Sequence, residues 1–336
     1  MQEIIKIDMP QDVVEIIQGL CSHGFAAYAV GGCVRDTLLG VEPKDWDITT
    51  SASPVEVKEI FGHTLDTGIE HGTVTIMRGK IGYEVTTYRI DGKYSGGRHP
   101  DQVKFTPNLF EDLRRRDFTI NAMAYSDEMG LVDEFCGMED LEKKVVRCVG
   151  EAKERFQEDA LRMLRAIRFS AQLGFTIESD TWQAMIQMAK NLSLVSKERI
   201  LVELTKTICS SHPEMVKKIF DSGLHKEIGQ HFSSLSARDA EVMAFSGQLP
   251  EEKHLRFALL FKNKSGEEAK AILRELKADN DTIKKVKILV EYIDRKLPRN
   301  EKRMRQALSE IGPERVRDWI LLKKVLGEEV EDFQNR

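Results

Sequence analysis

Two aspartates separated by a single residue, Asp45 and Asp47, are the first side chains of this sequence whose spacing suggests joint chemistry. They open the run Asp-Trp-Asp-Ile-Thr-Thr, which we interpret as a strand. On a strand, residues i and i+2 point to the same face, so both carboxylates should converge on one point. Adjacent carboxylates disfavour each other's ionisation, and a divalent metal ion relieves that repulsion. Hard oxygen ligands suit Mg²⁺, which also keeps substrate phosphates and water in its coordination shell.

A glycine pair precedes these aspartates. Gly31 and Gly32 follow a short β-prone run, residues 28–30, and lead into residues 34–39, whose apolar spacing is helical. Glycines at such a point let the backbone turn tightly or let a ligand approach. Backbone N–H groups at the start of a helix favour anions, and Arg35 is placed to bind phosphate through its planar guanidinium. The combination indicates a site that holds a nucleoside triphosphate for attack.

Each half of this pattern has a simpler interpretation on its own, because a Gly-Gly pair is usually a turn and Asp-x-Asp usually a solvated loop. Together, Gly-Gly-x-Val-Arg-Asp-x-Leu-Leu-Gly and Asp-x-Asp-Ile-Thr-Thr resemble the first motif of the nucleotidyltransferase superfamily that includes polymerase β. Within it, the sequence is similar to class II CCA-adding enzymes and bacterial poly(A) polymerases, through Arg168. The resemblance implies an α+β fold, with a polymerase-β-like nucleotidyltransferase head built on a small mixed sheet and an all-α neck and body.

The resemblance also implies roles for individual residues. In the family, the glutamate of a Glu-Val-Thr-Thr-Tyr-Arg segment, Glu84 here, is the third active-site carboxylate; a solvent-facing strand residue is the alternative. The last arginine of the family's Arg-Arg-Asp motif, Arg116 here, contacts the nucleotide, whereas most charge runs are solvated faces. Gly32 and Arg35 would hold the triphosphate. We expect Asp45 and Asp47 to be both catalytic and metal-binding.

A helix predicted for residues 155–173 carries the candidate base pocket. Its apolar residues gather on one side, Arg162 and Arg165 point the opposite way, and Asp159 and Arg168 flank them. The alternative is an amphipathic helix with a solvated basic face. The family uses this Glu-Asp-x-x-Arg-Met-Leu-Arg-Ala-x-Arg-Phe segment to choose the base. A carboxylate accepts from the exocyclic amine of cytosine or adenine and arginine donates to ring acceptors, so Asp159 and Arg162 would reject G and U without a template.

Composition limits the class of protein. The 336 residues exceed one ordinary domain, and a hydrophobic content of 41% is ample for sizeable cores. The net charge of −5 argues against a surface coated with basic charge, although residues 284–305 form a basic stretch that either follows an RNA backbone or is a solvated face balanced by acids. Five scattered cysteines without a Cys-x-x-Cys pair favour a reducing cytosol. With no signal-peptide or membrane-span pattern, we expect a cytoplasmic protein.

We expect three domains: a nucleotidyltransferase head at residues 1–150, a helical neck at 151–210 and a helical body for tRNA at 211–336. In the head, the patterns predict helices at 10–24 and 54–61, a hairpin from 72–77 and 83–88, and strands at 131–135 and 145–149. Beyond residue 180 they predict helices alone, at residues 182–189, 200–208, 214–220, 237–245, 254–261, 267–276, 280–294, 301–308 and 313–326.

The expected reaction is template-independent addition of CMP and AMP, from CTP and ATP, to the 3′ end of tRNA. The glycine-rich segment 91–100 reads Asp-Gly-Lys-Tyr-Ser-Gly-Gly-Arg-His-Pro and should form the mobile loop that CCA-adding enzymes carry, which favours the ability to add A. The alternatives are a poly(A) polymerase, an enzyme adding only CC or only A, a small-molecule nucleotidyltransferase and a non-catalytic RNA-binding protein. Intact Asp45 and Asp47 argue against the last, and the large helical half argues against the small-molecule enzyme.

Overall fold

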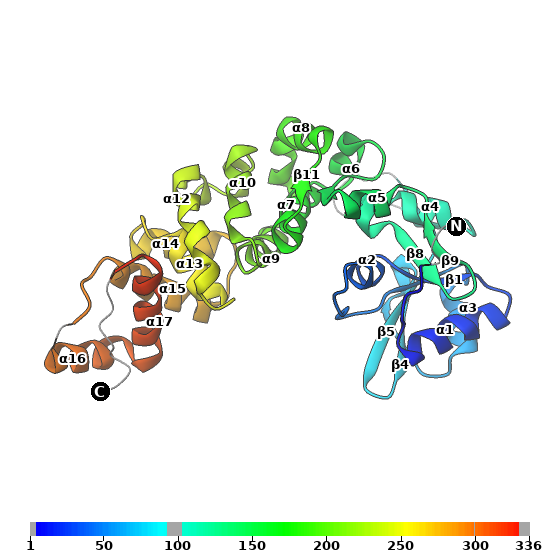
Figure 1. Ribbon diagram of the computed structural model, residues 1–336, viewed down its shortest axis with the longest axis horizontal. Helices are drawn as coiled ribbons and strands as arrows, with labels where there is room; N and C mark the ends of the chain where they lie inside the picture. The colour runs from blue at the N-terminus through cyan, green and yellow to red at the C-terminus, as the bar shows by residue number, and fades with distance from the viewer. Residues whose placement is uncertain (1–4, 93–102, 299, 329–336) are drawn as a thin grey trace. The chain divides into compact units, whose positions relative to one another are not determined.

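The computed structural model describes residues 5–92, 103–298 and 300–328 (Figure 1). The chain folds into two compact units, Met1–Asp159 and Ala160–Arg336. The sequence placed the first boundary after residue 150, whereas the first unit also contains helix α6 (Ala152–Glu158). A further division of the helical half at residue 210 stays a prediction. Of the loop expected at residues 91–100, residues 93–100 lie outside the described part of the chain.

A seven-stranded mixed sheet forms the centre of the first unit, in the order β3-β4-β5-β2-β1-β8-β9 (Figure 1). The strands are β1 (Ala27–Val30), β2 (Ile48–Thr50), β3 (Thr64–Gly68), β4 (Thr73–Arg78), β5 (Ile81–Thr87), β8 (Met123–Ser126) and β9 (Gly130–Asp133). Only the β2–β5 pair is parallel in this sheet, and the other neighbours are antiparallel. Because β1 runs antiparallel to β2, the glycine turn that follows β1 lies next to the start of β2, where Ile48 pairs with Val85 of β5.

The predicted hairpin is confirmed, since β4 and β5 pair antiparallel around a turn at Gly79, where φ is +60°. Along β5 the exposed Glu84 lies between two buried residues, as strand alternation requires. This alternation does not continue to Tyr88. The strand ends at Thr87, and Tyr88 is fully buried in the core of the first unit.

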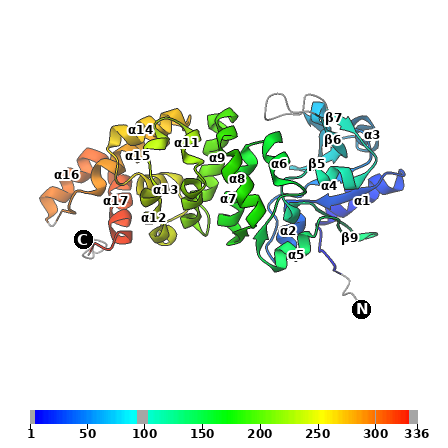
Figure 2. The ribbon, with the colours of Figure 1, turned by 90° about the horizontal axis from the view of Figure 1, so that it is seen from above.

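Helices and a second, two-stranded ribbon surround the sheet. The predicted helices at 10–24 and 54–61 are confirmed as α1 (Gln11–Ser22) and α3 (Pro54–Ile60), the latter starting in a capping box. The other elements are α2 (Gly32–Leu38), β6 (Arg89–Asp91), β7 (Val103–Phe105), α4 (Leu109–Arg114), the 3₁₀ turn η2 (Thr119–Asn121), α5 (Gly137–Glu142) and β10 (Val145–Val146). Strands β6 and β7 pair with each other, and α4 packs against β6 (Figure 2).

The second unit is helical apart from the short strand β11 (Thr176–Ile177), as predicted. Its α-helices are α7 (Leu161–Leu173), α8 (Ser179–Met188), α9 (Lys197–Ile208), α10 (Lys217–Asp221), α11 (His225–Ile228), α12 (Ala237–Glu241), α13 (Lys253–Leu260), α14 (Gly266–Glu275), α15 (Asn280–Ile293), α16 (Glu301–Ile311) and α17 (Pro313–Val325). The 3₁₀ turns are η3 (Ala189–Leu194), η4 (Pro213–Val216), η5 (Phe232–Ser234) and η6 (Val242–Gln248). Helix α15 packs beside α13, α14 and α17 (Figures 1 and 2).

The continuous helix predicted for residues 155–173 is wrong. The segment forms two helices, α6 and α7, interrupted at Asp159, whose backbone is extended with φ −145° and ψ 104°. Neither glycine nor proline marks the interruption in the sequence. The apolar spacing runs through it because each helix buries a side of its own, which includes Phe156 in α6 and Ile167 in α7.

Close packing of α5 against η2 gives a test of the head's architecture. A Cβ atom on Gly137 would lie 2.6 Å from the backbone oxygen of Thr119 and 2.8 Å from Cγ of Met123, so Gly137→Ala should destabilise the first unit by about 1–3 kcal/mol. Thermal unfolding of the full chain, followed by circular dichroism, should show an earlier first transition. Gly62→Ala is the control, because nothing lies within 4 Å of a Cβ there. Equal transitions for both variants would contradict this packing.

Candidate active site

The segment of Asp45 and Asp47 lies directly before β2. The strand begins at Ile48, so the expectation that both aspartates lie within it is wrong. Their side chains nevertheless alternate as on a strand, because Asp45 and Asp47 are exposed while Trp46 and Ile48 are buried. The backbone N–H of Val30 donates to the carbonyl oxygen of Asp47 at 3.0 Å, which extends the pairing with β1. This alternation in exposure is what extended backbone produces, in which residues i and i+2 face the same side.

Glu84 reaches this place from the neighbouring strand. The parallel register of β2 and β5 pairs Ile48 with Val85, and its continuation by one residue sets Asp47 beside Glu84. Both acids are exposed. The sequence predicted a role for Glu84 from family resemblance, and the register now supplies a geometric reason for it.

The pKa of Asp47 is raised from its ordinary value. Desolvation of the carboxylate by the protein atoms around it is the largest cause, and the negative charges of Glu84 and Asp45 add to it. The positive charge of Arg116 acts in the opposite direction. Glu84, Asp45 and Arg116 therefore all lie close enough to Asp47 to change the pKa of its carboxylate.

A divalent ion would relieve this repulsion. Among the described residues, no group of three or more histidine, cysteine, aspartate or glutamate side chains is arranged to hold a metal ion by itself. The donors here are two carboxylates, Asp45 and Asp47, with Glu84 near them. Mg²⁺ is commonly bound by one or two carboxylates and completes its shell with substrate phosphates and water. The donor chemistry fits that kind of substrate-assisted metal site.

The glycine turn lies against Arg116. Gly31 has φ +83° and ψ −124° and precedes the first residue of α2, Gly32. A Cβ on Gly31 would lie 3.1 Å from Nη1 of Arg116, so the missing side chain makes room for the guanidinium. The N–H of Gly31 donates to the carbonyl oxygen of Met123 at 3.1 Å, which leaves the donors of this turn to begin with Gly32.

Arg35 is held inside a polar network. Its Nε donates to Oδ1 of Asp36 at 2.8 Å and its Nη1 to Oδ1 of Asn121 at 2.5 Å. Asn121 in turn donates to Asp117 at 3.2 Å. No pattern in the sequence indicated Asn121 as a partner for Arg35. A role for Arg35 in phosphate binding stays a prediction.

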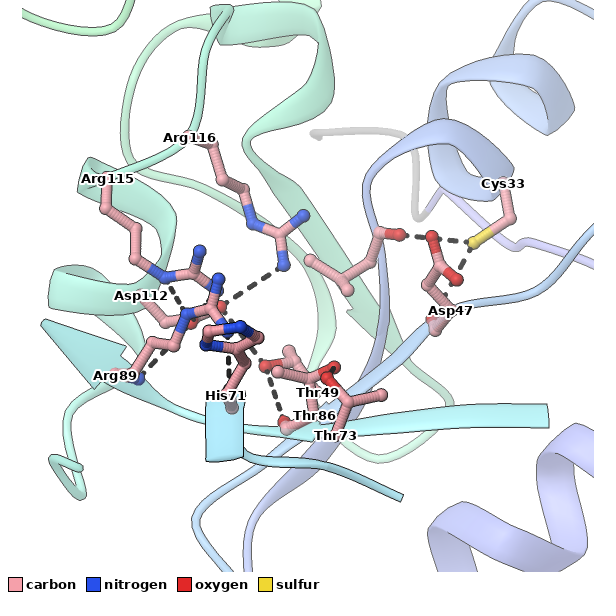
Figure 3. Close-up of polar contacts among 11 residues, drawn as sticks. Cys33, Asp47, Thr49, His71, Thr73, Thr86, Arg89, Asp112, Arg115 and Arg116 are labelled. Atoms are coloured by element: carbon pink, nitrogen blue, oxygen red, sulfur yellow. Dashed lines mark hydrogen bonds and ion pairs between the residues drawn. The ribbon is translucent and has the colours of Figure 1, made fainter. Parts of the chain in front are cut away.

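Arg116 is anchored by an acid that the sequence did not single out. Its Nη2 donates to Oδ2 of Asp112 at 3.2 Å, and Nε of Arg115 donates to Oδ1 of the same carboxylate at 3.0 Å (Figure 3). Asp112 is fully buried. In the sequence it is one of several charges in a mixed run, so nothing there separated it from a solvated residue.

In the second unit, two of the three arginines of α7 lie inside the protein. Arg162 and Arg168 are buried, which excludes the solvated basic face for them, because α7 packs against α9 and η4. Nη1 of Arg168 lies 3.2 Å from Oε2 of the buried Glu203, and Nη1 of Arg165 lies 4.0 Å from Oε1. The Arg168 guanidinium also lies 4.2 Å from the ring centroid of Phe169. The sequence predicted neither Glu203 nor Phe169.

Asp159 is the last residue of the first unit, and it is half-buried. Its expected role beside Arg162 stays a prediction. Three basic side chains in the stretch at residues 284–305 form ion pairs with acidic side chains. At those positions this favours a solvated surface with balanced charge over an RNA-binding surface. The ion pairs are Lys285–Asp281 at 2.8 Å, Lys287–Glu267 at 2.5 Å and Arg305–Glu301 at 2.5 Å. In the described ranges, no helix is long and apolar enough to cross a membrane.

Known proteins are similar to this chain in both sequence and fold. Residues 27–147 match the poly A polymerase head domain, and residues 174–234 match the probable RNA and SrmB-binding site of polymerase A. The CCA-adding enzyme of Pediococcus pentosaceus is 39% identical over 328 residues, which is 95% of this chain and 81% of that enzyme. The CCA-adding enzyme of Leuconostoc mesenteroides is 50% identical over 206 residues, 60% of this chain but only 51% of its relative.

Solved structures agree with these matches. The CCA-adding enzyme of Bacillus stearothermophilus in complex with CTP superimposes with a TM-score of 0.82 at 34% identity, covering 94% of this chain and 78% of that one. A tRNA nucleotidyltransferase with a primer tRNA and an incoming ATP analogue gives 0.70 at 25% identity, covering 92% and 94%. These findings confirm the α+β fold class and the predicted resemblance. Since a relative 39% identical is matched over most of its own length, the chain belongs to the family of CCA-adding enzymes, nucleotidyltransferases with a poly(A) polymerase head.

Proposed function

We propose that this protein is a CCA tRNA nucleotidyltransferase. It adds CMP and AMP from CTP and ATP to the 3′ end of tRNA without a template and releases pyrophosphate. The observation that carries the proposal is that the charges of Glu84, Asp45 and Arg116 all act on the Asp47 carboxylate, with Arg116 lying against the glycine turn. Relatives whose structures contain CTP, or a primer tRNA with an ATP analogue, support the substrate class. All five cysteines are free, which suits action in the reducing cytoplasm.

The head would supply the chemistry. Asp45 and Asp47, with Glu84, would hold Mg²⁺, which when bound activates the RNA 3′ hydroxyl and stabilises the departing pyrophosphate. Arg116 brings positive charge to the carboxylates and offers planar donors to the triphosphate. Gly32 leaves the backbone open to close approach, and Arg35 supports the turn through Asn121.

The base would be read by Asp159 and Arg162. A carboxylate that accepts from an exocyclic amine, beside an arginine that donates to a ring acceptor, matches cytosine and adenine and leaves polar groups unpaired against guanine and uracil. Arg165 and Arg168 complete the proposed set. Arg168 pairs with the buried Glu203, and Arg165 lies near the same carboxylate.

The carboxylates are tested first. Asp45→Ala or Asp47→Ala should abolish nucleotide incorporation and leave tRNA binding nearly intact, because charge stabilisation in the transition state is lost and the effect falls on kcat. Incorporation of labelled CMP into tRNA and a filter-binding assay measure the two quantities. Asp66→Ala, at an exposed aspartate that pairs with Lys58, is the control and should keep full activity. Robust turnover in Mg²⁺ by either active-site variant would refute the assignment.

Base choice is tested separately. Arg162→Ala and Asp159→Ala should each allow UTP or GTP to compete, while some activity survives through the phosphate contacts. Single-nucleotide incorporation with each of the four triphosphates gives the discrimination ratios. Arg274→Ala, at an exposed position on α14, should leave the ratios unchanged. If both variants lose activity but keep full preference for C and A, the base is read elsewhere.

The product identifies which enzyme of this kind it is. A tRNA lacking its last three nucleotides, incubated with CTP and ATP, should gain CCA and no more. Gel resolution separates this from the alternatives: two nucleotides from a CC-adding enzyme, A added only to tRNA ending in CC, or a long ladder from a poly(A) polymerase. Each of these three outcomes would overturn full CCA addition while leaving nucleotidyl transfer in place.

A further inference from the structure

Asp112, in α4, is the most heavily bonded acid near the site. Its carboxylate is 0% exposed. Oδ1 accepts from Nε and Nη2 of Arg115, at 3.0 and 2.7 Å, and from the backbone N–H of Arg89 at 3.3 Å. Oδ2 accepts from Oγ1 of Thr49 at 3.1 Å and from Nη2 of Arg116 at 3.2 Å (Figure 3). One carboxylate therefore joins α4 to β2, to β6 and to Arg116.

Stability alone does not explain such a group. Burying a carboxylate costs several kcal/mol, and replacing a buried ion-pair network with apolar side chains is often neutral or stabilising. Burial alone would raise the pKa of Asp112, but the charges of Arg116 and Arg115 hold it below its ordinary value. The carboxylate is thus kept ionised inside the protein, which points to a role in fixing geometry.

The geometry concerns the distance between Arg116 and the acids. Thr49 follows Asp47 by two residues, so strand periodicity sets its hydroxyl on the side of the carboxylates. Oδ2 of Asp112 binds this hydroxyl and the Arg116 guanidinium together. On its other side, the guanidinium lies against the space above Gly31. The arginine is therefore tied to the same strand that leads from Asp47.

We propose that Asp112 is a positioning residue for nucleotide binding, which holds Arg116 between the glycine turn and the carboxylates. This inference rests on the proposed function. The charges of Arg116 and Asp47 attract each other. If Arg116 had no other acid to bind, it would turn to pair with Asp47. When the Arg116 guanidinium is bound to Asp112, it keeps donors directed to the triphosphate. It then forms no ion pair with Asp45, Asp47 or Glu84.

The test is nucleotide affinity of the full chain. Asp112→Asn keeps the shape of the side chain and removes its charge. Titration with CTP in Mg²⁺, without tRNA, should show a Kd raised roughly tenfold or more, as expected for loss of a charge-assisted contact. In CMP addition, KM for CTP should rise in parallel while kcat at saturating CTP changes much less. An unchanged Kd in a folded Asp112→Asn protein overturns the proposal.

A double-mutant cycle separates positioning from simple destabilisation. Arg116→Ala should weaken CTP binding, and Asp112→Asn added to it should weaken binding no further, because both changes remove the same contact. Fully additive losses overturn the inference. A wild-type chain that binds no CTP would instead overturn the proposed function, and the inference with it.

Two controls keep the test interpretable. Asp140 is a matched buried carboxylate, which accepts from Oγ1 of Thr119 at 2.6 Å and pairs with Nε of Arg147 at 3.1 Å. Asp140→Asn should lower stability comparably and leave Kd unchanged; an equal rise in Kd overturns the proposal. If Asp112→Asn does not fold, Thr49→Val, which removes only the hydroxyl donor, should raise Kd several-fold, and Thr49→Ser should restore it. Equal Kd values for these two variants overturn it as well.

Discussion

Repulsion between carboxylates is the constraint on which the head depends. The parallel pairing of β2 with β5 brings Asp47 beside Glu84, and extended backbone adds Asp45 on the same side. Glu84 and Asp45 raise the pKa of Asp47, and the positive charge of Arg116 opposes them. The fold therefore has to supply positive charge close by without letting it neutralise the acids, and the elements around β2 are arranged to do so.

Each unit holds arginines against a buried acid. In the head, Asp112 holds Arg115 and Arg116; in the second unit, Glu203 pairs with Arg168 and lies near Arg165. A guanidinium fixed in this way loses little conformational entropy on meeting a ligand, because its geometry is already set. Asp112 and Glu203 are nearly inaccessible to solvent, so they act on a ligand through the arginines that they hold.

Local patterns in the sequence predicted much of this arrangement. The β4–β5 hairpin, the helices of the second unit and the shared side of Asp45 and Asp47 all follow from periodicities of two or 3.6 residues. No local pattern predicted the strands β3 and β8, the interruption at Asp159, or the partners Asp112 and Glu203. Thr49 and Asp112 are 63 residues apart, and Arg168 and Glu203 are 35 apart, so tertiary packing alone brings them together. Chain periodicity carries no signal for such pairs.

Gly31 and Gly32 differ in how readily each can be replaced by another amino acid. Position 31 combines a positive φ with a guanidinium nitrogen 3.1 Å from where a Cβ would stand, so any side chain there would be both strained and crowded. Position 32 begins α2, and its nearest neighbour, Nη2 of Arg35, would lie 3.8 Å away at ordinary contact distance. The two glycines therefore differ in their constraints. Substitution of Gly31 is opposed by backbone strain and by the neighbouring guanidinium, whereas substitution of Gly32 is limited only by the ligand that must approach it.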